Sequence, residues 1–236
     1  MNCRMIYAAL CAAVYVLVCC SALLLIWRYL IRRFLCRRRG LRRLAESAVV
    51  VTGCDSGFGR LIALRLHDLG ATVFAGCMQK QSCEALNKDR KKMRAFLCNV
   101  CKDEDVAKCL KLVQESGLPF LALVNNAGIS AFGWAESLDV RTYQRNMDVN
   151  FFGTVRMTRA FLPLLRKDRG RLINMGSIGA RMPSAFGSAY LSTKAAMSSY
   201  SESVRQEMHR FGVHVSLIEP GFFATGLLAA GAAAGK

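Results

Sequence analysis

The chain begins with an apolar stretch in which no polar face is visible. Residues 5–27 carry no charged side chain, and Ser21 is their only markedly polar residue. At about 1.5 Å per residue, a helix of this length spans a hydrocarbon core about 30 Å thick. A cleaved secretory signal usually has a shorter apolar segment, of about seven to fifteen residues. The pattern therefore predicts a retained N-terminal transmembrane helix, with the anchor covering residues 1–28.

Basic residues follow the apolar stretch at once and mark a linker over residues 29–46. Eight arginines lie between positions 28 and 43, namely Arg28, Arg32, Arg33, Arg37, Arg38, Arg39, Arg42 and Arg43. The residues before the stretch carry a single charged side chain, Arg4. Because positively charged flanks stay on the cytosolic side of a membrane, this asymmetry predicts a domain that faces the cytosol.

The arginine cluster accounts for much of the net charge of +17. Beside a predicted membrane span it indicates contact with anionic lipid headgroups, so we expect membrane lipid and no nucleic acid as a partner. The eleven cysteines, an odd number, show no paired C-x-x-C spacing of the metal-site type. They suit a reducing compartment with mostly free thiols, and we expect no metal site.

Beyond the linker, apolar segments alternate with amphipathic ones. The apolar segments predict strands at residues 48–52, 71–76, 94–98, 120–124, 171–176 and 213–218. The amphipathic segments predict helices near residues 58–68, 80–88, 103–115, 139–165 and 189–210. This alternation predicts an α/β fold, a Rossmann-like doubly wound parallel sheet with helices on both faces. We expect one dinucleotide-binding domain over residues 47–227, followed by an Ala/Gly-rich tail over residues 228–236.

A glycine-rich turn lies between the first predicted strand and the first predicted helix. Residues 52–59 read Thr-Gly-Cys-Asp-Ser-Gly-Phe-Gly, with the spacing G-x-x-x-G-x-G. Glycines let the backbone approach a pyrophosphate, and the helix N-terminus offers it N–H groups and a positive dipole end. The segment therefore predicts a dinucleotide site.

Tyr190 and Lys194 lie four residues apart in a helix-forming stretch, so both side chains share one helical face. An ammonium beside a phenol favours the phenolate and is expected to lower the tyrosine pKa from about 10. Such a tyrosine exchanges a proton with an alcohol or carbonyl oxygen near neutral pH. Ser177 lies thirteen residues before the tyrosine, and Asn150 lies twenty-seven residues before the serine.

Together these motifs resemble the short-chain dehydrogenase/reductase family over roughly residues 47–227. Residues 52–59 resemble its T-G-x-x-x-G-x-G loop, and residues 125–128 resemble its N-N-A-G segment. Pro220-Gly221, with Thr225 four residues beyond the glycine, resembles the segment that contacts the nicotinamide end. The residues that match the catalytic tetrad of the family in order and separation are Asn150, Ser177, Tyr190 and Lys194.

The resemblance implies a role for each of these four residues. Tyr190 would be the general acid/base, and Lys194 would lower its pKa and bind the nicotinamide ribose. Ser177 would hydrogen-bond the substrate oxygen. Asn150 would help position Lys194 and a proton-relaying water through a local helix distortion. The resemblance also implies NAD-dependent oxidoreductase chemistry on an alcohol or ketone.

The cofactor-binding residues that the resemblance implies are Thr52, Gly53, Asp55, Ser56, Gly57, Phe58, Gly59, Cys77, Asn99, Val100, Asn126, Ala127, Gly128, Tyr190, Lys194, Pro220, Gly221 and Thr225. A carboxylate after the second strand would bind the adenosine 2′-hydroxyl, and an arginine there would accept a 2′-phosphate. Residues 76–80 contain neither, so NAD and NADP both stay open. Asp55 adds a negative charge that disfavours another phosphate, and we expect NAD.

Several segments resemble the membrane-associated retinol and hydroxysteroid dehydrogenases, and others are similar to D-3-hydroxybutyrate dehydrogenase. Residues 54–59, 73–77 and 151–155 are similar to the first group, whereas residues 99–101 and 128–130 are also similar to the second. The expected substrate is a small apolar alcohol or ketone, of retinoid or hydroxysteroid type, with 3-hydroxybutyrate as the alternative. We expect the endoplasmic reticulum membrane, with the mitochondrial membrane as the alternative, and a possible homodimer.

The chain departs from the family pattern at its C-terminal end. Members of the family continue well beyond the Pro-Gly segment with substrate-covering helices and a final strand, whereas this sequence stops fifteen residues after Gly221. The resemblance therefore predicts a dehydrogenase that lacks its substrate lid. The alternative is a catalytically impaired cofactor-binding or interaction protein.

Overall fold

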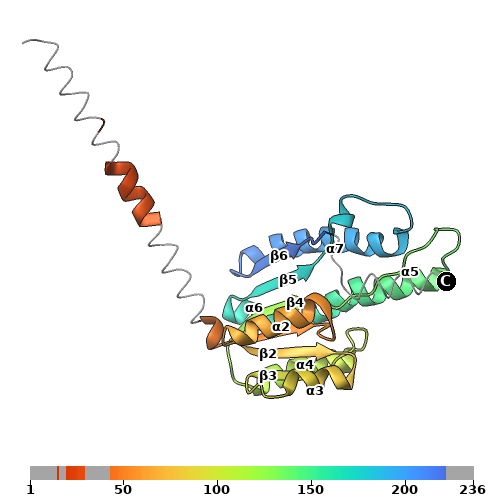
Figure 1. The fold of residues 1–236 in the computed structure, drawn as a ribbon, viewed down its shortest axis with the longest axis horizontal. Helices are drawn as coiled ribbons and strands as arrows, with labels where there is room; N and C mark the ends of the chain where they lie inside the picture. Colours follow the sequence, from red (N-terminus) through yellow and green to blue (C-terminus); the bar gives the residue numbers. More distant parts are fainter. Residues whose placement is uncertain (1–14, 16–19, 30–42, 222–236) are drawn as a thin grey trace, which may run out of the picture. The chain divides into compact units, whose positions relative to one another are not determined.

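The computed structural model describes residue 15, residues 20–29 and residues 43–221. The chain divides into two units, Met1–Arg43 and Leu44–Lys236. In the first unit residues 20–29 are helical (Figure 1). Among the residues that the structure describes, no helix is long and apolar enough to cross a membrane. Most of the predicted anchor, the predicted tail and Thr225 lie outside the described residues.

The second unit is built on a parallel sheet whose strand order is β3-β2-β1-β4-β5-β6 (Figure 1). Its six strands are β1 (Ala48–Thr52), β2 (Thr72–Cys77), β3 (Met93–Leu97), β4 (Phe120–Asn125), β5 (Arg171–Met175) and β6 (His214–Ile218). The order reverses between β1 and β4, because the chain leaves the far edge at β3 and returns beside β1. In such sheets the crevice beyond the carboxyl ends of the strands at this reversal is the usual ligand site.

The helices cover both faces of this sheet. They are α2 (Gly57–Asp68), α3 (Lys80–Asn87), α4 (Asp103–Glu115), α5 (Val140–Met147), α6 (Gly153–Asp168) and α7 (Ser188–His209). Successive side chains of a strand point to opposite faces, and β1 shows this directly. Val50 joins one apolar core with residues of α4, α6 and α7, whereas Val49 and Val51 join a second core with residues of α2 and α3. The central strand is therefore buried on both sides.

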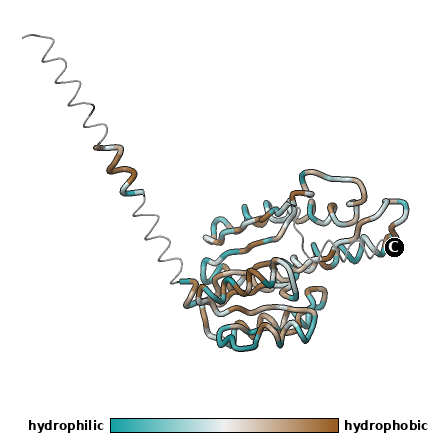
Figure 2. The backbone as a smooth tube through the Cα atoms, in the orientation of Figure 1, coloured by the Kyte–Doolittle hydropathy of each residue, from teal (hydrophilic) through white to brown (hydrophobic). Residues whose placement is uncertain are grey.

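Two-sided burial explains why the central strands β1 and β2 are largely apolar and do not alternate. All five residues of β1 and all six of β2 are buried. Figure 2 shows hydrophobic positions along the central strands and hydrophilic positions on the outer parts of the helices. Parallel strands covered by helices on both faces have this composition, so the predicted doubly wound parallel sheet is confirmed.

The segment predicted as one helix over residues 139–165 is interrupted. The structure has α5, then a π-helix at Asp148–Phe152, then α6, which ends at Asp168. A π-helix inserts an extra residue into the turn and rotates the side chains that it carries. Here it changes the direction in which Asn150 points, and periodicity alone gave no sign of it.

The core between β4 and α6 depends on an aromatic pair. Phe120 and Phe161 are fully buried, with ring centroids 5.1 Å apart. We expect Phe161→Ala to lower the free energy of unfolding by about 3–5 kcal/mol, because it removes buried surface and leaves a cavity. Leu112→Ala, at a partly exposed position of α4, is the control and should cost less than about 1 kcal/mol. Denaturant unfolding measures both, and equal losses would contradict the packing argument.

Candidate active site

Asn150 lies in the π-helix, fully buried, and ties two distant segments together. Its Oδ1 accepts a hydrogen bond from the Ile129 backbone N–H at 2.8 Å, and its Nδ2 donates to the Ile129 carbonyl at 2.9 Å. The same Nδ2 donates to Thr193 Oγ1 at 3.0 Å. Thr193 stands on α7 directly before Lys194. The helix distortion that the resemblance implied is present, and the side chain of Asn150 contacts α7 through Thr193, which sequence reasoning missed.

Tyr190 and Lys194 lie on the first turns of α7, and both are buried. Lys194 Nζ donates to the carbonyl of Met175 at 2.8 Å, at the carboxyl end of β5. The same nitrogen lies 5.6 Å from the centroid of the Tyr190 ring. Ser177 follows β5, and its side chain lowers the pKa of Tyr190. The structure thus brings three of the four tetrad residues together at the end of β5, and Asn150 supports the helix that carries two of them.

The electrostatics of this group differ from the sequence-based expectation. Burial raises the pKa of Tyr190 above its ordinary value, and the hydrogen bond with Ser177 opposes part of that rise. Burial also lowers the pKa of Lys194 from 10.5 to about 8. The expectation that the lysine lowers the tyrosine pKa is therefore wrong for these residues by themselves. Burial disfavours the charged form of the phenol, and this desolvation is the largest cause of the rise.

The glycine-rich turn has the backbone conformation that its sequence predicts. Gly53 has φ of +69° and Gly57 has φ of +55°, in the region that favours glycine. A Cβ atom on Gly59 would lie 2.2 Å from the carbonyl oxygen of Gly53 and 2.4 Å from Asn126 Nδ2. The third glycine is therefore needed for close packing of the helix on the turn.

The Asn-Asn-Ala-Gly segment after β4 holds this turn in place. Asn126 Nδ2 donates to the carbonyls of Thr52 at 2.9 Å and Gly53 at 3.1 Å. Thr52 Oγ1 accepts from the backbone N–H groups of Asn126 and Ala127, each at 3.0 Å. A Cβ atom on Gly128 would lie 3.2 Å from Asn150 Oδ1. The segment thus contacts the turn on one side and the π-helix on the other.

The turn fits a bound pyrophosphate. Ser56 is the N-cap residue of α2, and its side chain makes no capping hydrogen bond there. No acidic residue lies in the first turn of α2. Phe58 and Gly59 follow within that first turn. A helix N-terminus without a side-chain cap or a competing carboxylate offers its dipole to an anion. The residues present therefore fit the phosphates of a nicotinamide dinucleotide.

The remaining predicted cofactor residues lie at the same edge of the sheet. Cys77 ends β2. Asn99 and Val100 follow β3, where Asn99 Oδ1 accepts from the Cys101 N–H at 3.0 Å. At the far end, the Pro220 carbonyl accepts from the Ile178 N–H at 3.0 Å. Gly221 is the last described residue.

Asp55 lies in the turn and reaches the loop after β2. Its Oδ2 accepts from the Met78 N–H at 2.8 Å, and its Oδ1 accepts from the Gln79 N–H at 2.9 Å. Gln79 is the N-cap residue of α3, and its own side chain makes no capping hydrogen bond. Asp55 therefore caps α3, a helix that begins more than twenty residues later in the chain.

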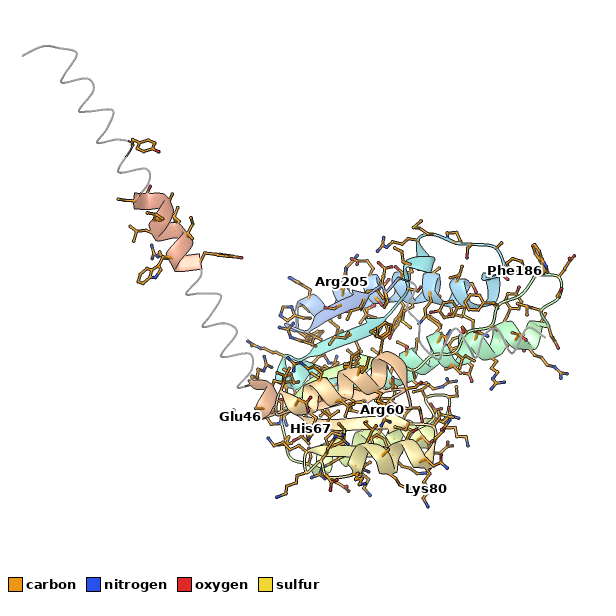
Figure 3. The ribbon with its side chains drawn as sticks, viewed as in Figure 1. Glu46, Arg60, His67, Lys80, Phe186 and Arg205 are labelled. Carbon is orange, nitrogen blue, oxygen red and sulfur yellow. The ribbon has the colours of Figure 1, made fainter. Side chains whose placement is uncertain are left out.

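Aromatic residues that sequence reasoning missed stand next to Tyr190. The Phe132 ring centroid is 5.8 Å from that of Tyr190. Trp134 and Phe186 stack with centroids 4.2 Å apart, and the Gly133 N–H donates to the Phe186 carbonyl at 2.8 Å. Trp134 is 57% exposed and Phe186 is 46% exposed. Figure 3 labels Phe186 at the surface. The sequence signal was the presence of large aromatic residues in the loop after residues 125–128 and in the loop before Tyr190. Only the tertiary structure pairs them.

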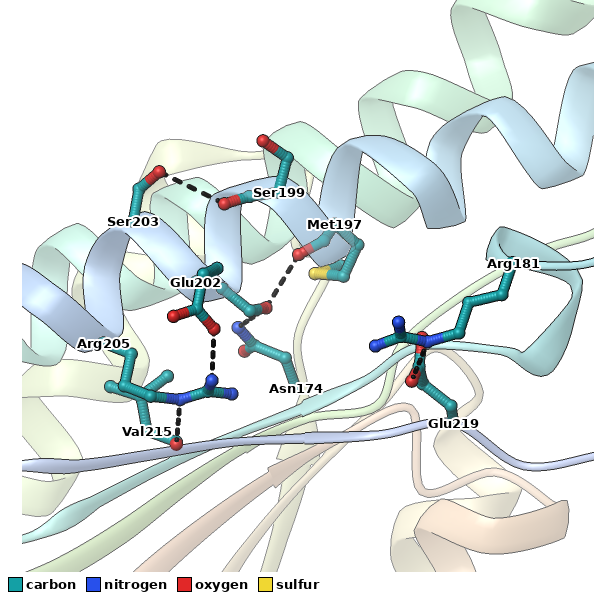
Figure 4. Close-up of polar contacts among 10 residues, drawn as sticks. Asn174, Arg181, Met197, Ser199, Glu202, Ser203, Arg205, Val215 and Glu219 are labelled. Atoms are coloured by element: carbon teal, nitrogen blue, oxygen red, sulfur yellow. Dashed lines mark hydrogen bonds and ion pairs between the residues drawn. The ribbon is translucent and has the colours of Figure 1, made fainter.

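A separate hollow of about 670 Å³ lies against α7 and β6, and Figure 4 shows the polar contacts of several residues that line it. Its lining includes Arg181, Glu202, Arg205 and Glu219, and none of the four tetrad residues. Arg181 Nε donates to Glu219 Oε2 at 2.7 Å, and Arg205 pairs with Glu202. Arg205 Nε also donates to the Val215 carbonyl at 3.1 Å. β6 is an end strand of the described sheet, and a cation on an open strand edge limits unwanted strand pairing.

A protein-family model described as short chain dehydrogenase matches residues 47–234. The chain belongs to the short-chain dehydrogenase family. It is 43% identical over 191 residues to bovine mitochondrial D-beta-hydroxybutyrate dehydrogenase, covering 75% of this chain and 54% of that protein. It is 42% identical over 191 residues to rat estradiol 17-beta-dehydrogenase 2, covering 78% and 50%. It is 38% identical over 210 residues to mouse retinol dehydrogenase 16, covering 87% and 66%. The dehydrogenase thus spans about half the length of the first two relatives.

Solved structures agree with this assignment. The chain superimposes on a closed form of serine dehydrogenase complexed with NADP+ with a TM-score of 0.76 and 29% identity, covering 79% of this chain and 77% of that one. It superimposes equally well, with a TM-score of 0.76 and 26% identity, on a 3-ketoacyl-(acyl-carrier-protein) reductase from Brucella melitensis complexed with NADH. Coverage there is 79% of this chain and 80% of that one. One of these neighbours is complexed with NADP+ and the other with NADH.

The lowered pKa of Lys194 predicts a pH-dependent stability. Between about 8 and 10.5 the unfolded chain binds the lysine proton and the folded chain does not, so stability rises with pH in this window. Relative to Lys194→Met, the free energy of unfolding of the wild-type chain should increase across it by at most about 3 kcal/mol. Denaturant unfolding of both proteins at several pH values measures this. A pH-independent difference would contradict the lowered pKa.

Proposed function

We propose that this dehydrogenase transfers a hydride between NAD(H) and an apolar secondary alcohol, ketone or retinol-type substrate, of the retinoid or hydroxysteroid class. The observation that carries the substrate class is the aromatic surface beside Tyr190. Phe132 lies against the tyrosine, and the Trp134–Phe186 pair stands exposed on loops beside it. Large planar apolar molecules gain free energy by covering such rings, whereas a small carboxylate would gain little.

The chemistry follows from the residues at the end of β5. The bound nicotinamide would supply the hydride acceptor or donor. Ser177 would donate a hydrogen bond to the substrate oxygen and hold it near the phenol of Tyr190, whose pKa the serine side chain already lowers. Tyr190 would take the hydroxyl proton during oxidation and return it during reduction. A raised pKa keeps the phenol of Tyr190 protonated near neutral pH, so its proton is available to the substrate oxygen during reduction.

Lys194 would hold the nicotinamide ribose and pass protons onward. With a pKa of about 8 the Lys194 side chain can exchange between amine and ammonium close to neutral pH, which suits a proton relay. Asn150 would act indirectly, since its bonds to Ile129 and Thr193 fix the loop after β4 against α7. The cofactor that we propose is NAD, with NADP as the alternative, because family structures hold either one.

A second candidate substrate is 3-hydroxybutyrate. It is favoured by the 43% identity to the bovine mitochondrial D-beta-hydroxybutyrate dehydrogenase. A further alternative, a cofactor-binding protein of low activity, would bind NADH and turn over no alcohol. One panel of substrates therefore separates all three.

We expect the full chain to oxidise a retinol or a hydroxysteroid with NAD faster than it oxidises 3-hydroxybutyrate, measured by NADH absorbance. Tyr190→Phe should abolish turnover and leave NADH affinity nearly unchanged, because only the hydroxyl is lost. Tyr143→Phe, which removes a hydroxyl bonded to Ser188 at 2.7 Å, is the matched control and should keep most of the turnover. Turnover of 3-hydroxybutyrate alone would favour the second substrate, and near-normal turnover by Tyr190→Phe would overturn the assignment of the acid/base.

We further propose that residues 5–27 anchor the enzyme in the endoplasmic reticulum membrane with the catalytic unit in the cytosol. The uncharged stretch and the arginines after it support this, and the mitochondrial membrane is the alternative. The same arginines would contact anionic lipid headgroups. A homodimer is a proposal as well, through the segments around α6 and α7.

Protease added to sealed microsomes that carry the full chain should digest the catalytic unit, because it faces the outside of the vesicle. The control is the same treatment after detergent has opened the vesicles. Full protection without detergent, followed by digestion with it, would place the unit in the lumen and contradict the proposed topology.

A further inference from the structure

The loop after β2 carries two backbone N–H groups in a position that matters for cofactor choice. Met78 and Gln79 directly follow β2, and Gln79 is the N-cap residue of α3. In a doubly wound sheet the adenosine ribose lies at the carboxyl end of this strand, where a side chain distinguishes the 2′-hydroxyl of NAD from the 2′-phosphate of NADP. The residues that usually make this distinction are absent from positions 77–79, which are Cys, Met and Gln.

Asp55 occupies these two donors from a different loop. Both oxygens of its carboxylate are used, one for each N–H, at 2.8 Å and 2.9 Å. A carboxylate bound by the backbone at a helix N-terminus is stabilised there by the helix dipole. A 2′-phosphate at this place would meet a fixed negative charge and would find the two N–H groups already engaged. A 2′-hydroxyl carries no charge and can donate a hydrogen bond to the same carboxylate.

Two cationic residues lie on the helices that flank this turn. Arg60 lies on α2 and Lys80 is the first residue of α3 (Figure 3). Burial raises the pKa of the Cys77 thiol, the charge of Asp55 raises it further, and the charge of Arg60 opposes this rise. The charges of Asp55 and Arg60 therefore both act at the end of β2. Lys80 lies 3.9 Å from Glu84, and both side chains are largely exposed. Removing the charge of Asp55 would leave these cations available to a phosphate.

We propose that Asp55 is the residue by which this chain selects NAD(H) over NADP(H), through its carboxylate on the Met78 and Gln79 N–H groups. This inference rests on the proposed function, since it assumes that the glycine-rich turn binds a nicotinamide dinucleotide. It assigns the selection to the turn, in place of a residue at the end of β2.

The test is a pair of binding constants, for NADH and NADPH, measured by fluorescence titration of the full chain. The wild-type chain should bind NADH at least about tenfold more tightly than NADPH, as two like charges at close range in a partly buried site imply. Asp55→Asn keeps one acceptor for the backbone and removes the charge. It should reduce this ratio by at least about tenfold, mainly by tightening NADPH. Asp55→Ser is a second neutral variant for the case in which the first lowers the temperature of thermal unfolding.

Glu84→Gln is the matched control, because it removes a negative charge from α3, the helix that Asp55 caps, and leaves the two N–H groups unchanged. Its ratio should stay within about threefold of the wild-type value, since exposed charges are screened. Equal shifts in Glu84→Gln and Asp55→Asn would show a general effect of charge and overturn the proposal. So would an unchanged ratio in folded Asp55→Asn and Asp55→Ser. Failure of the wild-type chain to bind either cofactor would instead overturn the proposed function, and the inference with it.

Discussion

The burial of β1 on both faces is the constraint on which the rest of the structure depends. Val50 packs into one core while Val49 and Val51 pack into the other, so helices must cover both sides of the sheet. In the strand order, β2 and β3 lie to one side of β1 and β4 to β6 lie to the other. Residues of α2 and α3 cover one face of the sheet, and residues of α4, α6 and α7 cover the opposite face. The reversal beside β1 places the glycine-rich turn and the Asn-Asn-Ala-Gly segment at one edge. There the hydrogen bonds of Asn126 and Thr52 join them.

The active-site group depends on a second constraint, the need to satisfy buried polar atoms. Asn150 is fully buried, and its amide meets this need with the two backbone groups of Ile129 and with Thr193. An unpaired buried amide costs about 1–3 kcal/mol, so the π-helix that aims this side chain is offset by the bonds that it allows. Helix α7 is thereby fixed against the loop after β4, and Tyr190 and Lys194 move with it.

Burial and charge act against each other at the two functional ends of the molecule. At Lys194 burial lowers the pKa of the ammonium to about 8, while the carbonyl of Met175 accepts a hydrogen bond from it. At Asp55 the carboxylate stays at a less buried place and is held by two backbone N–H groups. The first arrangement suits a group that exchanges protons, and the second suits a group that keeps a fixed charge.

The sequence by itself determined the sheet, the order of the motifs and the family. The strands are marked by largely apolar runs, and each lies within about two residues of its predicted bounds. In the central strands β1 and β2, burial on both faces explains the apolar run. The glycines of the turn were equally visible, since Gly53 and Gly57 need positive φ and Gly59 has no room for a Cβ atom. The tertiary structure alone decided what depends on residues far apart in the chain. The contact of Asn150 with Thr193, the contact of Asp55 with the start of α3, and the pairing of Trp134 with Phe186 are of this kind. The direction of the Tyr190 pKa belongs here too, because spacing shows that a lysine is near and not how deeply both groups are buried.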